Sequence, residues 1–165
     1  GALCVYDESV YELTRSVFSG NTATGTAGAI VQVGGQGTVS QVVVHDNDGA
    51  YGAIVVSEGA LDVTNTIISA NEGDAVVASD ASVDVSWTDA WGNDRDVFTG
   101  ASEGDGNIAE DPRFVDPDGD GVDGADYHLA ATSPCVDAGD PSISDEDGTR
   151  SDMGAYGGPE PEETR

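Results

Sequence analysis

The sequence has 165 residues, enough for one domain, with 32 acidic residues against five arginines, no lysine and a formal net charge of −27. Phosphate binding needs a cationic surface, so this composition excludes nucleic acid as a partner and disfavours an anionic membrane surface. No run approaches the roughly 20 apolar residues that cross a bilayer, so membrane insertion is not expected either.

Residues 1–93 contain an internal repeat, which is marked by an asparagine at intervals of 26, 24 and 22 residues. The four asparagines are Asn21, Asn47, Asn71 and Asn93. Four blocks of 20 residues end on these asparagines and align without gaps, beginning at Ala2, Gly28, Gly52 and Asp74. All differences in length fall between the blocks, as expected for repeats joined by variable corners.

Within each block β-branched apolar residues tend to alternate with polar ones, as at 60–64 and 82–86. This is the period of a strand with one buried face, not of a helix. A single coil is too short to bury its own apolar face, but coils stacked about 4.8 Å apart align like residues into continuous interior ladders. The repeat therefore predicts an all-β solenoid of about four coils, in which asparagine adopts the left-handed conformation at a corner.

The alignment also assigns residues to the interior. Cys4 shares a column with Ile30, Ile54 and Val76, so it is predicted to be a core residue and not to form a disulfide with Cys135. A second column carries Val17, Val43 and Ile67 but has Asp89 in the last coil. His45 falls in a corner column and is predicted at the surface.

The repeat fails after Asn93, so the solenoid is predicted over 1–93, a loop-rich C-terminal cap over 94–159 and a charged, disordered tail over 160–165. Residues 94–110 are acidic and glycine-rich and are predicted to form a loop. The large apolar residues of the cap are expected to cover the open end of the solenoid; they are Phe114, Tyr127, Leu129, Val136, Met153 and Tyr156.

The polar residues of the cap are expected to be structural. Asp137 and Asp152 are predicted to fix turns by accepting hydrogen bonds from backbone N–H groups. Arg113 and Arg150 are scarce cations in an acidic chain and are predicted to pair with carboxylates.

Three segments of the cap are distinctive: DPRFVD, DYHLAATSPCVDAGDP and DGTRSDMGAYGGP. They resemble the C-terminal end of bacterial right-handed parallel β-helix repeat proteins. The resemblance implies a right-handed parallel β-helix and a secreted or cell-surface location. It implies no single activity, because this fold carries lyases, hydrolases, epimerases and adhesins.

The sharpest chemical signal is an acidic run that begins at Asp116 and continues with Asp118, Asp120 and Gly121. Carboxylates at positions 1, 3 and 5 followed by glycine match the first half of an EF-hand calcium loop. Position 12 is Tyr127, not an acidic residue, so Asp123 or Asp126 would have to substitute for it with a different geometry, and Asp123 is the first choice. The run predicts a Ca²⁺ site at Asp116, Asp118, Asp120 and Asp123; the alternative is a solvated acidic insertion.

Catalytic residues are not predicted. Asp62 and Asp84 share a column in adjacent coils and are interpreted as solvated strand residues. Asp89, with Trp87 and Trp91 nearby, indicates a weak sugar-stacking patch, or else an adaptation of the last coil to the cap.

The sequence therefore favours a non-catalytic, extracellular structural or surface-binding module, stabilised by calcium and belonging to the C-terminal part of a larger secreted protein. The alternative is the terminal part of a polysaccharide-active β-helix enzyme (a lyase, hydrolase or epimerase) with its catalytic coils upstream. Expected partners are glycans or cell-surface proteins. The first coil lacks an N-terminal cap, so end-to-end stacking through this open coil is also expected.

Overall fold

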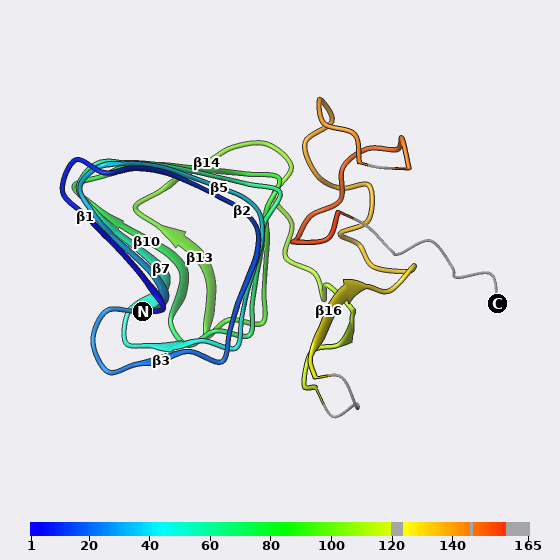
Figure 1. Cartoon of the computed structure of the whole chain (residues 1–165), viewed down its shortest axis with the longest axis horizontal. Coiled ribbons are helices and arrows are strands. Elements are labelled where there is room, and N and C mark those ends of the chain that lie inside the picture. Colours follow the sequence, from blue (N-terminus) through cyan, green and yellow to red (C-terminus); the bar gives the residue numbers. More distant parts are fainter. Residues whose placement is uncertain (120–123, 146, 158–165) are drawn as a thin grey trace.

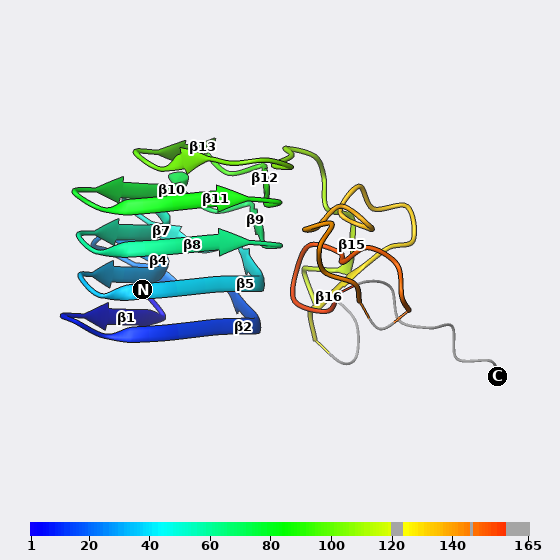
Figure 2. The same ribbon diagram turned by 90° about the horizontal axis from the view of Figure 1, so that it is seen from above.

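The structure is a computed structural model that describes residues 1–119, 124–145 and 147–157. These residues form a parallel β-solenoid with a separate layer at its side, and none of them is helical (Figures 1 and 2). The first sheet contains five parallel strands in spatial order: β1 (Leu3–Tyr6), β4 (Ala27–Val33), β7 (Gly52–Ser57), β10 (Asp74–Ser79) and β13 (Arg95–Thr99).

The second sheet is also parallel and bends at a corner. In the first two coils one long strand runs through the bend, namely β2 (Val10–Ser19) and β5 (Gln36–His45). In later coils the strand is divided there, giving β8 (Ala60–Thr64) with β9 (Ile67–Ser69), β11 (Ser82–Ser86) with β12 (Asp89–Trp91), and β14 (Ser102–Glu103). Two short strands, β3 (Thr22–Ala23) and β6 (Asp48–Gly49), pair beside the first sheet.

The register of the second, third and fourth coils confirms the gapless alignment from Ile30 onward, whereas Ala27 and not Gly28 lies opposite Gly52. Ile30, Ile54 and Val76 lie opposite one another on neighbouring strands and are fully buried. The same holds for Val39, Val63 and Val85 on the second sheet. Like residues thus form interior ladders, and each coil completes the apolar core that its neighbours need.

The first coil differs from the alignment by one residue. Leu3, not Cys4, lies opposite Ile30 and packs against the core, whereas Cys4 is exposed opposite Val31. The corner after β1 holds three residues, 7–9, and the corresponding corner after β4 holds two, 34–35. The prediction of a core position for Cys4 is therefore wrong, because the extra residue falls inside the block and shifts β1 alone.

This placement predicts different reactivity for the two thiols. In the native protein we expect Cys4 to react with a maleimide at the rate of a free thiol, whereas Cys135, which is fully buried, should stay protected. Mass spectrometry of the alkylated, digested protein would identify the labelled cysteine. Equal labelling of both cysteines would contradict the structure.

Residues 94–110 continue the solenoid as a shorter fifth coil, so the predicted loop is wrong. β13 pairs with β10 and β14 pairs with β11. Asn107 takes part in the stacking, since its Oδ1 accepts a hydrogen bond from Thr88 N (3.0 Å) and its Nδ2 donates to Val85 O (2.9 Å). The sequence repeat does not reveal this coil because the pairing of β13 with β10 shifts register between Asp74 and Val76 and the strands of the coil are short.

The asparagine column forms a hydrogen-bonded ladder at one corner. The side chain of Asn47 donates to Asn71 Oδ1 (2.9 Å), and that of Asn71 donates to Asn93 Oδ1 (2.8 Å). The same Oδ1 atoms also accept backbone N–H groups of the preceding coil. The left-handed conformation was predicted for these asparagines but occurs one residue earlier, at Gly20, Asp46, Ala70 and Gly92.

The C-terminal layer, defined here as residues 111–145 and 147–157, lies along the side of the stack and not across its end (Figures 1 and 2). It contains the antiparallel pair β15 (Phe114–Asp116) and β16 (Asp126–Leu129). The predicted end cap is therefore wrong. The layer instead covers an outward apolar column of the second sheet, formed by Val17, Val43 and Ile67. The tail predicted over 160–165 lies outside the described residues.

Candidate functional site

The contact between the solenoid and the C-terminal layer is a second hydrophobic core. Val43 and Ile67 point away from the interior of the coils and are fully buried under the layer. The layer contributes Tyr127, Leu129, Cys135, Met153 and Ala155. Five of the six apolar residues expected to cover the solenoid end pack here, and the sixth, Tyr156, remains half exposed.

Asn65 is the main polar link in this interface. It is fully buried at the bend of the second sheet, in a left-handed conformation with φ 48°. Its Nδ2 donates to Ser151 Oγ (3.1 Å), its Oδ1 accepts from Asp140 N (2.7 Å) and its carbonyl accepts from Gly154 N (2.8 Å). One side chain thereby satisfies buried groups from two segments of the layer, a role that the sequence analysis did not predict.

Asp89 lies in the same interface. It is fully buried, and its carboxylate accepts hydrogen bonds from Glu110 N (3.1 Å) and from Cys135 Sγ (3.4 Å). Burial, followed by the charge of Asp89, raises the pKa of the Cys135 thiol. The thiol is therefore protonated and acts as a donor, and Asp89 fixes the layer where the apolar column ends.

The two tryptophans near Asp89 have different surroundings. Trp87 is half-buried, packs against the interface core and lies beside Gly106 of the fifth coil. Trp91 is 38% exposed. Because Asp89 has no exposed surface, Trp87, Asp89 and Trp91 do not form one open patch, and the geometry agrees with an adaptation of the coil to the C-terminal layer.

The two histidines lie at the edges of the layer. His45 is half-buried, not at the surface as predicted, and its ring makes edge contacts with Phe114 and Tyr127 at centroid distances of 5.6 and 5.5 Å. Burial lowers the pKa of His45, although nearby Asp46 and Asp118 oppose this effect. His128 stacks on Tyr156 at 4.0 Å.

The predicted calcium loop is only partly described. Asp116 ends β15 opposite Asp126 of β16, and Asp118 is exposed just beyond it. Asp120 and Asp123 lie outside the described residues. Within the part of the chain that the structure describes, no three or more His, Cys, Asp or Glu side chains are grouped to hold a metal ion. Calcium binding at this loop therefore stays a prediction.

The arginines of the layer bind backbone carbonyls, so the predicted pairing with carboxylates such as Asp137 and Asp152 is wrong for both within the residues that the structure describes. Arg113 donates from Nη1 to Thr132 O (2.7 Å). Arg150 donates to the carbonyl groups of Ala138 and Gly139. Planar guanidinium groups thus bridge turns that have no regular backbone pairing of their own.

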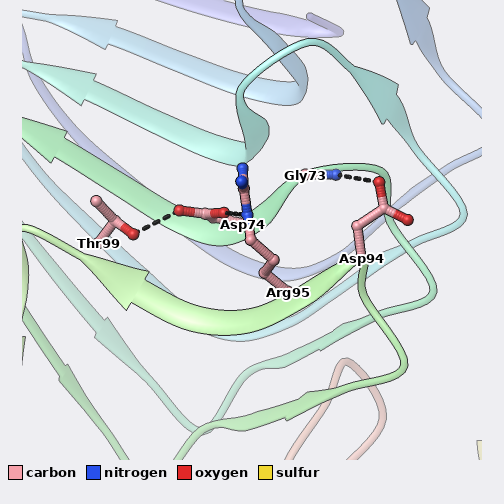
Figure 3. A network of polar contacts seen from close by, with 5 residues as sticks. All are labelled: Gly73, Asp74, Asp94, Arg95 and Thr99. Carbon is pink, nitrogen blue, oxygen red and sulfur yellow. Dashed lines mark hydrogen bonds and ion pairs between the residues drawn. The ribbon is translucent and has the colours of Figure 1, made fainter.

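An arginine–carboxylate pair does occur in the solenoid, at the junction of the fourth and fifth coils (Figure 3). Asp74 is 5% exposed and accepts hydrogen bonds from Arg95 Nε and Thr99 Oγ1. Next to it, Asp94 accepts a hydrogen bond from Gly73 N (3.2 Å). The contacts join β10 to β13 where their register shifts, which is a structural role.

Asp152 is the most unusual carboxylate of the layer. Its side chain is 1% exposed, and Oδ1 accepts the backbone N–H of Asp137 at 2.6 Å, as the sequence predicted for a turn-fixing residue. Its Oδ2 is buried and has no hydrogen-bond partner. Burial raises the pKa of Asp152 to about 6, and the charges of Asp145, Asp137 and Asp147 act in the same direction.

This shift predicts a pH dependence of stability in calcium-free buffer. The pKa of Asp152 is raised above the unfolded value of about 3.9, so the folded state binds a proton more readily and stability falls as pH rises through 6. We expect Asp152→Asn, which keeps the Oδ1 acceptor, to remove about 1 kcal/mol of this decline between pH 4.5 and 7.5, after allowance for solvent screening. Urea unfolding at several pH values measures it; identical slopes in both proteins would contradict it.

Comparisons with known proteins give no relative. No protein-family model matches the chain, and neither a curated protein nor a solved structure matches it. In the described residues, no helix has the length and apolar character needed to cross a bilayer. The fold is therefore established by the stacked strands themselves.

Proposed function

We propose that the chain is a non-catalytic structural module of a secreted or cell-surface protein, which presents the outer faces of a β-solenoid to glycans or cell-surface proteins. The observation that carries this proposal is the use of the buried polar groups in the interface. Asn65 and Asp89 attach the C-terminal layer to the coils, and Arg150 joins turns within it. These polar side chains, which could otherwise take part in catalysis, are thus used in hydrogen bonds that stabilise the fold.

The outer surface supports a role that depends on cations. Asp62 and Asp84 lie directly opposite each other on β8 and β11, and both are exposed. Like charges directly opposite on neighbouring strands are destabilising, and a net charge of −27 adds to this repulsion. Calcium at Asp116, Asp118, Asp120 and Asp123, with salt around the remaining carboxylates, would offset it.

The open first coil supports end-to-end stacking as a further part of the proposal. The outer edges of β1 and β2 have no paired strand in the described residues, and Val10 is 81% exposed there. Unpaired strand edges are templates for association. Sedimentation velocity over a range of protein and salt concentrations tests it, and a monomer under all conditions would contradict stacking.

Glycan-array binding with and without millimolar Ca²⁺ tests the surface-binding role. The proposal expects binding to a restricted set of glycans without chemical change. Incubation of the chain with acidic polysaccharides, followed by size analysis and a reducing-end assay, tests the non-catalytic part. Shortened or unsaturated products would contradict the proposal and favour a polysaccharide-active enzyme.

A further inference from the structure

The two ends of the solenoid are built differently. The C-terminal layer lies along the side of the stack, and its described residues cover neither end (Figure 2). At the first coil the outer edge is long, because β2 spans 10 residues. At the fifth coil the edge is short, because β13 has 5 residues and β14 has 2. Unpaired strand edges are templates for association, and short strands weaken such an edge.

The first coil ends in an apolar cross-section. Leu13 and Phe18 continue the interior columns of Val39 and Val44. Val39 and Val44 have no exposed surface, whereas Leu13 and Phe18 are only partly buried, since no described coil lies beyond them. The residues of this coil that pack against the core are all uncharged: Leu3, Tyr11, Leu13 and Phe18. A second apolar surface placed on this end would therefore complete the burial of the first coil.

The outer edge of β2 also carries an unused backbone donor. Gln36 N donates to Ser9 O (2.8 Å) in the coil before it. One coil further, Ala60 N donates to Gly35 O (3.0 Å). Val10 occupies the same position in the first coil, opposite Gln36, so its N–H points to the open side. Its side chain is 81% exposed.

The fifth coil carries a charge in an interior column. Glu103 pairs with Val85, so it continues the column that holds Val39, Val63 and Val85 in the coils before it. The pairing of β13 with β10 also shifts register. Inward-pointing charges, irregular pairing and short strands all keep sheet edges from associating. A further coil on this end would bury the carboxylate of Glu103 in an apolar column, which is unfavourable for an unpaired charge.

We propose that the chain binds a second copy of itself through the first coil, and that Glu103 keeps the fifth coil from taking part. The dimer is a specific form of the end-to-end stacking in the proposed function and rests on it. Two first coils related by a two-fold axis pair their β2 edges antiparallel. This arrangement brings Glu12 of each copy close to Arg15 of the other, and both side chains are exposed.

The symmetry of the contact decides the size of the assembly. A contact between two first coils uses the same surface on both copies, so it closes at a dimer. A contact between a first and a fifth coil would repeat from copy to copy and give a fibre. Since each copy carries a net charge of −27, the dimer should also become tighter as salt screens the repulsion.

The test is sedimentation velocity of the full chain over a range of protein concentrations, at low salt and in about 0.5 M NaCl. Val10→Pro removes the open N–H, and proline is tolerated where the N–H of an edge strand faces solvent. Val10→Thr is the matched control, because it keeps the N–H. Glu103→Val removes the charge from the interior column, and Glu110→Val makes the same change at an exposed position outside it.

We expect wild type, Val10→Thr and Glu110→Val to form a dimer and no larger species. Val10→Pro should raise the Kd of the dimer roughly 30-fold, because one hydrogen bond is lost from each copy. Glu103→Val should form species larger than a dimer, and their share should rise with protein concentration, because its fifth coil is then open to association.

Species larger than a dimer in the wild type would overturn the proposed dimer and leave stacking in place. An unchanged dimer in Val10→Pro would overturn it too, as would the absence of larger species in Glu103→Val. A monomeric wild type at every concentration and salt would contradict the stacking itself. If Val10→Pro does not fold, as judged by circular dichroism, the comparison of Glu103→Val with Glu110→Val decides.

Discussion

Replacement of Asn71 by alanine should lower the free energy of unfolding by about 3–5 kcal/mol, because several buried polar groups lose their partners at once. Asn71 is 2% exposed, and its Nδ2 donates to Val44 O (3.0 Å), Ser69 O (2.9 Å) and Asn93 Oδ1. Its Oδ1 accepts from the backbone and the side chain of Asn47. Urea denaturation followed by circular dichroism measures the change.

Asn21 provides the control at the end of the same ladder. It is only half-buried and donates to Asn47 Oδ1 and Ser19 O, with no coil beyond it in the described residues. Asn21→Ala should therefore cost about 1 kcal/mol or less, since water replaces the lost contacts. Equal losses for the two variants would contradict a cooperative, buried ladder.

Replacement of Asn65 by glycine should detach the C-terminal layer without unfolding the coils. Glycine accepts the left-handed conformation of this position, so the change removes the side-chain contacts to Ser151 and Asp140 and adds no backbone strain. The loss is about 2–3 kcal/mol, or roughly 30- to 150-fold in the population of the detached form. The layer opens locally, because its interface is separate from the interior of the solenoid.

Cys135 reports this opening. In a Cys4→Ser background the thiol of Cys135 is the reporter, and its rate of reaction with a disulfide reagent should rise by the same factor of roughly 30 to 150. Gln41→Gly is the matched control, because Gln41 occupies the same left-handed corner in the coil before, and among the described residues its side chain accepts a hydrogen bond from Arg15 and from no buried group of the layer. A similar increase for both variants would contradict the role of Asn65.

The coils could be predicted because stacking forces like residues into columns. The blocks from Gly28, Gly52 and Asp74 hold in the structure from Ile30 onward, since the apolar residues of neighbouring coils must stack to bury the core. A register shift between Ala27 and Ile30 places Ala27, not Gly28, opposite Gly52. Cys4 was misplaced because corners do tolerate an extra residue, and a corner within the block is invisible when blocks are aligned without gaps. The fifth coil was missed because its strands are short and its register shifts.

The position of the C-terminal layer could not be predicted from its own residues. An apolar segment can cover an open end or an apolar side, and composition does not distinguish the two. The sequence feature that indicates the position of the layer lies in the coils. Val17, Val43 and Ile67 form an outward-facing apolar column, and exposure of such a column to water would be unfavourable. Asp89 interrupts this column at the position where Cys135 of the layer donates a hydrogen bond to it. The sequence does not reveal this pair, because the two residues are brought together only by the fold.

The layer at the side of the stack has a consequence for unfolding. Coils that touch only their neighbours can unravel one at a time from either end. Here the segment forms one hydrophobic cluster with Val43 and Ile67 of the second and third coils, and Val17 of the first coil and Ile108 of the fifth pack against this cluster. Loss of an outer coil therefore also breaks contacts of a segment shared by the inner coils. The segment therefore couples the coils, so that we expect them to unfold cooperatively and not one at a time from an end, including under force along the solenoid axis.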